Sequence, residues 1–159
     1  PRPAMHDTNL LQLIIDDFVP VQQLLELLQA ESVALHGRDM PLLENILAQK
    51  QALIILLDQH GRKRSEILAS LNLPASHDGL EQLASQSTIG DQLLSQSKVL
   101  NDLLAQCQAT NARNGQSIQM QQAATANQLR ILNGGEIPTL YDASGSTARM
   151  VKHRPLSQA

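Results

Sequence analysis

The chain has 159 residues, enough for one domain with its own core, and aromatic residues make up 1 % of it. Its formal net charge is −3, so it has neither the basic surface that attracts phosphate nor the aromatic platforms on which single-stranded nucleic acids stack. A nucleic-acid-binding function is therefore excluded. The apolar residues are mainly Leu, Ile, Val and Ala, a composition that favours an all-α fold.

The single cysteine, Cys107, cannot form an internal disulfide, which is consistent with a reducing compartment. No apolar run approaches the ~20 residues that are needed to cross a bilayer, and the first residues have no apolar signal-peptide segment. We therefore expect a cytoplasmic protein without a membrane span.

The first expected helix covers residues 8–36, where apolar residues recur at alternating steps of three and four. This heptad row consists of Leu11, Ile14, Phe18, Val21, Leu25, Leu28, Ser32 and Leu35. Pro20 has no amide hydrogen and crowds the preceding turn, so it either kinks the helix or marks its effective start. Gly37 can adopt the left-handed conformation that ends a helix.

A second helix is expected over residues 40–72. Asp39 can cap its start, and Pro74 disfavours helical geometry in the residue before it. Apolar residues recur at a mean step of about 3.5, but some positions on the same track are polar. These polar positions are Lys50, His60 or Gly61, and Arg64.

A short amphipathic helix near residues 78–87 precedes the longest expected helix, 91–132, in which many heptad positions are polar. Asn111 and Asn114 lie on this heptad track, and Gly115 follows them. A polar residue there costs stability but can set register or oligomeric state. The segment is therefore a close helix crossing, a surface kept for a partner, or a thinly buried and frayed stretch.

We predict an all-α fold, an antiparallel bundle of three long helices with coiled-coil-like heptad packing and a C-terminal tail. A break at Asn114-Gly115 would make the bundle four-helical. The bundle domain comprises residues 1–135. Residues 136–159 contain prolines and no sustained periodicity, and they form a tail suited to ordering on a partner.

The residues give no sign of catalytic chemistry. None of the common phosphate-binding, dinucleotide, zinc-protease or nucleophile-elbow motifs occurs, and the five histidines are scattered. We therefore expect no enzyme, no cofactor and no metal. The cluster Arg62-Lys63-Arg64 is interpreted as a solvated helix face, with a protein docking patch as the alternative. Cys107 is interpreted as a small buried apolar residue.

Four motifs follow one another along the chain. The first comprises Glu31, Leu35, the Arg38-Asp39 turn, Leu42, Leu47, Lys50 and Leu53. The second comprises Leu57, residues 62–64 and Leu68. The third is Asn111-x-x-Asn114-Gly115-x-x-Ile118, and the fourth is Leu140-Tyr141-Asp142-Ala143-Ser144-Gly145. Together they resemble the FlgN-type flagellar export chaperones over nearly the whole chain, with Asp142 where the family often has glycine.

The resemblance implies a chaperone that binds the hook-associated filament-junction proteins FlgK and FlgL in the cytoplasm. It would prevent their premature assembly and deliver them to the cytoplasmic domain of the flagellar export gate, where Tyr141 would dock. The implied cargo site lies in the C-terminal part of the chain. The candidate partner-binding residues are Asn111, Asn114, Ile118, Leu129, Ile131, Leu132, Ile137, Leu140 and Tyr141.

The alternative is a structural or signalling coiled coil. That hypothesis predicts a stable symmetric homodimer with a dispensable tail, whereas the chaperone hypothesis predicts that residues beyond about Asn111 are needed for binding. The sequence leaves a homodimer open in either case.

Overall fold

The computed structural model describes the backbone of residues 3–132 and the side chains of residues 5–124 and 126. This part of the chain forms helices and no strands, which confirms the predicted all-α fold. The helices are α1 (Pro3–Asp16), α2 (Phe18–Gly37), α3 (Met40–Ser70), α4 (His77–Ser85) and α5 (Gly90–Leu132). The predicted bounds agree closely with α3, α4 and α5. The predicted tail, residues 136–159, lies outside the described residues.

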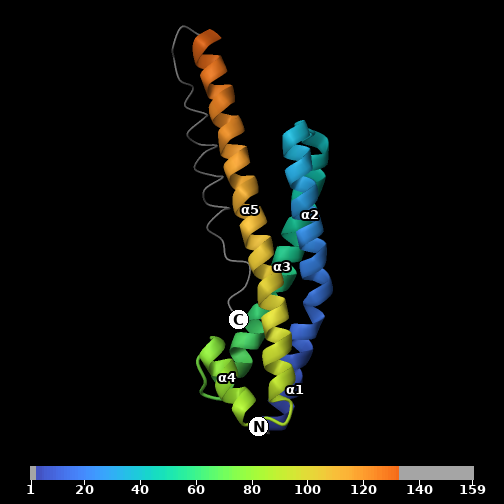
Figure 1. Ribbon diagram of the computed structural model, residues 1–159, viewed down its shortest axis with the longest axis vertical. Coiled ribbons are helices and arrows are strands. Elements are labelled where there is room, and N and C mark those ends of the chain that lie inside the picture. Colours follow the sequence, from blue (N-terminus) through green and yellow to red (C-terminus); the bar gives the residue numbers. More distant parts are fainter. Residues whose placement is uncertain (1–2, 133–159) are drawn as a thin grey trace.

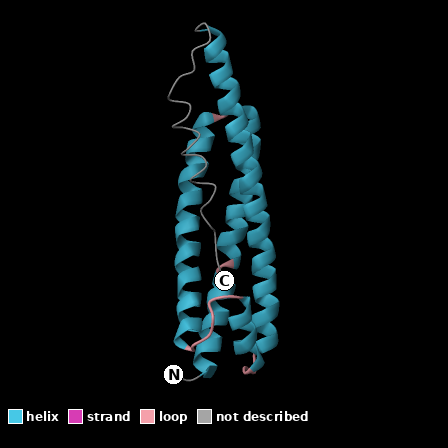
Figure 2. Ribbon diagram, turned by 90° about the vertical axis from the view of Figure 1, so that its left-hand side faces the viewer, coloured by secondary structure: helices cyan, strands magenta, loops and turns pink. Residues whose placement is uncertain are grey.

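The long helices form an elongated antiparallel bundle (Figure 1). The rod made of α1 and α2 rises from the foot of the molecule, α3 returns, and α5 rises again beside α2. The short α4 packs against the lower part of α5. Both α3 and α5 pack mainly against α2, and in the view of Figure 2 α3 lies on the opposite side of the molecule from α5.

A break at Asp17 separates α1 from α2. Pro20 lies in the first turn of α2, where amide hydrogens have no partner within the helix, so a proline is tolerated there. The Asp17 amide donates to the Ile14 carbonyl oxygen at 3.2 Å, and the Val21 amide donates to the Asp17 carbonyl oxygen at 3.0 Å. Of the two alternatives for Pro20, the start of a new helix is therefore the one observed.

The turn between α2 and α3 differs from the prediction in one residue. Gly37 is still helical, and Arg38 has the left-handed conformation, with φ 54°. The helix runs one residue further because the Arg38 and Asp39 amides donate to the carbonyl oxygens of Leu35 and Ala34, which completes the C-terminal cap. The Asp39 side chain then accepts from the Leu42 amide at 3.2 Å, so the predicted cap of α3 is confirmed.

The buried row of α1 and α2 is also shifted by one residue in places. It consists of Leu10, Ile14, Asp17, Val21, Leu24, Leu28, Glu31 and Leu35. The predicted Ser32 is exposed, while Phe18 and Leu25 are half-buried at the edge of the core. Asp17 and Glu31 face the interior because both carboxylates form ion pairs with cations of α3.

The helix α5 runs without interruption through Asn114 and Gly115, so the bundle does not gain a further long helix there. By length and composition alone, α3 is long and apolar enough to cross a membrane, which the prediction of no span did not anticipate. In this structure, however, α3 is a bundle helix, because Lys50 and Arg64 face the interior and pair with α2 and the α1–α2 junction.

Candidate functional site

The lower polar layer of the bundle surrounds Asp17. Its carboxylate pairs with Arg64 Nη1 at 2.5 Å and with His60 Nδ1 at 2.5 Å, and both partners come from α3. Since Arg64 is buried, it does not belong to a solvated basic face as predicted. Only Arg62, which pairs with Asp58 one turn away, and Lys63 are exposed there.

The upper polar layer joins all three long helices. Lys50 Nζ on α3 lies 2.9 Å from Glu31 Oε2 on α2 and donates to Asn111 Oδ1 on α5 at 3.2 Å. Asn114 Nδ2 on α5 donates to Glu31 Oε1 at 2.8 Å. Each member of the layer therefore has a hydrogen-bonding partner on another helix, as buried polar groups require.

Side chains of α5 also bind backbone carbonyl groups of α2 at heptad intervals. The contacts are Cys107 Sγ to Val21 O at 3.7 Å, Asn114 Nδ2 to Leu28 O at 2.9 Å, and Gln121 Nε2 to Leu35 O at 2.7 Å. In each pair the donor follows the acceptor by 86 residues. A constant separation along two helices means that they run parallel and keep the same register.

Cys107 is fully buried in this row, which confirms its interpretation as a small core residue. Burial raises the pKa of the Cys107 thiol from 9.0 to about 11, because the thiolate would lose its hydration. The thiol is therefore neutral and inert at physiological pH.

The predicted partner-binding residues occupy three different environments. Asn111 and Ile118 are half-buried on α5, whereas Asn114 is only 3 % exposed and binds within the chain. The backbone of Leu129, Ile131 and Leu132 forms the last turns of α5, and their side chains are not among those described. The remaining three, which are Ile137, Leu140 and Tyr141, lie outside the described residues. The structure thus brings together Asn111, Asn114 and Ile118.

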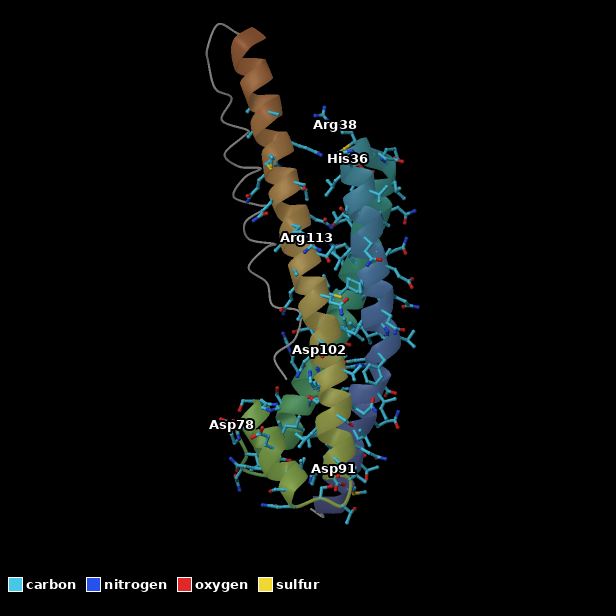
Figure 3. All side chains as sticks on the ribbon, viewed as in Figure 1. His36, Arg38, Asp78, Asp91, Asp102 and Arg113 are labelled. Atoms are coloured by element: carbon cyan, nitrogen blue, oxygen red, sulfur yellow. The ribbon has the colours of Figure 1, made fainter. Side chains whose placement is uncertain are left out.

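A hollow of about 290 Å³ lies at the upper end of α4, between α3 and α5. Its walls include Leu68 of α3, Leu80 of α4, and Leu104 and Gln108 of α5. The helix α4 ends well below the top of α5: in Figure 3, Asp78 lies at the upper end of α4, while Arg113 on α5 lies far above it. The hollow was not predicted from the sequence, although the short length of the expected helix 78–87 was a signal for it.

The described residues have no arrangement suited to a reaction. No group of three or more His, Cys, Asp or Glu side chains among them could hold a metal ion. The His60 side chain contacts the buried carboxylate of Asp17, and this carboxylate also pairs with Arg64. What α5 offers is a long face of amide, small and apolar side chains, which is suited to contact with another helix.

The comparisons with known proteins agree with this structure. The model of the FlgN protein family matches residues 5–149. A crystal structure of the flagella synthesis protein FlgN from Pseudomonas aeruginosa is similar, with a TM-score of 0.66 and 29 % sequence identity over 90 % of this chain and 95 % of that chain. Among curated proteins, none matches the chain at a significant level. Since the family match covers most of the sequence, the chain belongs to the FlgN family of non-enzymatic flagellar chaperones.

Proposed function

We propose that this chain is a flagellar type III export chaperone for the hook-associated proteins FlgK and FlgL. It would bind their aggregation-prone helical termini in the cytoplasm and deliver them to the cytoplasmic domain of the export gate. Family membership supports the chaperone role, and the choice of FlgK and FlgL as cargo follows from what the family resemblance implies.

One structural observation carries the location of the site: α5 is longer than the helices against which it packs. Gln121 is level with Leu35, near the end of α2, yet α5 continues to Leu132. About 11 residues, or ~16 Å at 1.5 Å per residue, therefore extend past this hydrogen bond to α2. Figure 1 shows this end of α5 rising above the turn between α2 and α3.

A projecting helix end followed by further chain can wrap a partner helix that lays its apolar stripe against it. We assign cargo contact to this end of α5 and to the residues that follow it: Leu129, Ile131, Leu132, Ile137, Leu140 and Tyr141. Asn111 and Ile118 would extend the contact downward along α5. Asn114 would act indirectly, because its hydrogen bonds fix α5 on α2.

The test is size-exclusion chromatography with light scattering of this chain mixed with purified FlgK or FlgL from the same organism. A parallel sample uses the chain ending at Ile131, which retains nearly all of α5. We expect a complex with the full chain that is lost on truncation. If neither cargo binds and both versions form a stable homodimer, the protein is a structural coiled coil instead.

A further inference from the structure

A heptad row on α3 changes from buried to exposed along its length. The row consists of Met40, Leu47, Ile54, Gly61 and Leu68. Leu68 lines the hollow above α4 and is 1 % exposed, Ile54 is half-buried, and Leu47 is 46 % exposed. Residues one heptad apart share a face of a bundle helix. The row is therefore covered at the foot of the molecule and uncovered above it.

The facing side of α5 shows a similar change. Leu104 lines the hollow and is buried, whereas Asn111 and Ile118, one and two heptads further, are half-buried. A neighbouring heptad row contains Gln108, which also lines the hollow, and then Gly115 and Gln122. The Oε1 atom of Gln122 is shielded from solvent and has no hydrogen-bond partner among the described residues.

The cause is the length of α4. With 9 residues it fills the fourth-helix position of the bundle for ~14 Å only, while α5, with 43 residues, spans ~65 Å. Above α4, no described helix covers the space between α3 and α5, and the two helices are joined there by the hydrogen bond from Lys50 to Asn111. We call the residues that flank this position, Leu47, Ile54, Asn111, Ile118 and Gln122, the upper face.

We propose that the upper face is the docking site for an amphipathic helix of the cargo, which takes the fourth-helix position in line with α4. This inference rests on the proposed function and adds α3 to the cargo site. The α3 wall is apolar, so the apolar stripe of the incoming helix lies on Leu47 and Ile54. The α5 wall carries the amide side chains of Asn111 and Gln122, which suit the polar edge of that helix.

Two observations identify the occupant as a helix with an uncharged contact face. The same position is already occupied by a helix lower down, where Leu80 of α4 lines the hollow. The cation that joins α3 and α5 at this level, Lys50, is already paired with Glu31 and Asn111. A charged stripe would lose its hydration against Leu47 and Ile54, whereas an apolar one would cover a row that is exposed to solvent without it.

The first experiment measures the affinity of the full-length chain for purified FlgK and FlgL by isothermal titration calorimetry. Leu47→Ser is compared with Leu42→Ser, a matched control on the same helix that is 43 % exposed but, five residues away, lies on another face. We expect Leu47→Ser to raise the Kd about tenfold, as the loss of one apolar anchor does, and Leu42→Ser to change it less than about twofold. Equal affinities of both variants would overturn the inference while leaving the chaperone function in place.

The second experiment identifies the occupant directly. Leu47→Cys and Leu42→Cys are each labelled with benzophenone maleimide, mixed with cargo and illuminated, and the cross-linked peptides are sequenced by mass spectrometry. Wild type is the labelling control, because its own Cys107 is buried. Cross-links from position 47 to a helical segment of the cargo, and none from position 42, support the inference. Cross-links from position 47 to residues 133–159 of the same chain, or to a second copy, overturn it. If wild type binds neither cargo, the proposed function and the inference fall together.

Discussion

Asn114 on α5 donates a hydrogen bond to the backbone carbonyl oxygen of Leu28 on α2, at 2.9 Å, and the two residues are 86 positions apart. The same side-chain amide also donates to Glu31, so one asparagine satisfies a backbone group and a charge of another helix. A leucine at this position would pack against α2 but would leave both acceptors without this donor. This explains why a polar residue occupies a heptad position of the longest helix.

Replacing Asn114 with alanine should therefore destabilise the fold. We expect a loss of about 1–3 kcal/mol in the free energy of unfolding, because two buried acceptors lose a donor. The exposed Gln116, two residues further along α5, serves as the control, and Gln116→Ala should change the free energy by less than about 0.5 kcal/mol. Urea titrations followed by circular dichroism measure both. Equal stabilities of the two variants would remove the structural role of Asn114.

The same substitution at the adjacent residues Lys63 and Arg64 should lower the stability by very different amounts. Arg64→Met leaves Asp17 buried beside His60 without its main cation, which we expect to cost about 3–5 kcal/mol. Lys63→Met changes an exposed side chain and should cost less than about 0.5 kcal/mol. The shift of the thermal unfolding midpoint distinguishes the two, and similar shifts would contradict the assignment of Arg64 to the core.

The buried thiol makes stability fall at high pH. Because the pKa of Cys107 is raised from 9.0 to about 11 in the folded chain, both states keep the thiol proton below about pH 9. Between pH 9 and 11 the unfolded state releases this proton while the folded state retains it, so unfolding becomes more favourable. We expect the urea midpoint of wild type to fall further between pH 8 and 10.5 than that of Cys107→Ala. Parallel pH profiles would contradict the predicted shift.

Alanine at all six proposed contact residues should weaken cargo binding. These residues are Leu129, Ile131, Leu132, Ile137, Leu140 and Tyr141. We expect at least a tenfold rise in Kd, or about 1.4 kcal/mol, with unchanged helical content, because alanine is a strong helix former. Calorimetry and circular dichroism give the two quantities. Unaltered binding by the six-fold variant would show that cargo contacts another surface.

Tyr141→Ala alone should separate the two proposed steps. We expect cargo affinity to stay within about threefold of wild type, while secretion of FlgK and FlgL into the culture medium falls. The reason is that Tyr141 is one of six proposed cargo contacts, whereas gate docking is assigned to this side chain alone. Phe at the same position tests whether the ring suffices. Normal secretion by Tyr141→Ala would remove the docking role.

The helices were predictable because their signals are local. Asp39 with Pro41 marks the start of α3, Pro74 follows its end, and the heptad spacing continues through Asn114 and Gly115. The inward face of α1 and α2 was harder to predict from the sequence. A pattern based on apolar residues selects Phe18 over its neighbour Asp17, since a lone carboxylate does not enter a core.

Asp17 faces inward instead of Phe18 because the cations that pair with the buried carboxylates lie on another helix, α3. Asp17 and Glu31 are two heptads apart on one rod, and Lys50 and Arg64 are two heptads apart on α3. Because the two spacings are equal, two antiparallel helices can pair both carboxylates with both cations in a single register. The upper face was not predicted, although the sequence indicated that α4 is short, because the face depends on where α4 packs along α5, which the periodicity of a single helix does not specify.

The hydrogen bonds between helices also indicate the order in which the chain assembles. Lys50 and Glu31 are 19 residues apart, whereas Asn114 and Leu28 are separated by 86. Closing the longer loop costs about 1.3 kcal/mol more chain entropy. We therefore expect the hairpin of α2 and α3 to form early, even during synthesis on the ribosome, and α5 to pack against it last. The helix that carries the proposed cargo site is then also the helix that we expect to detach first when the bundle unfolds partially.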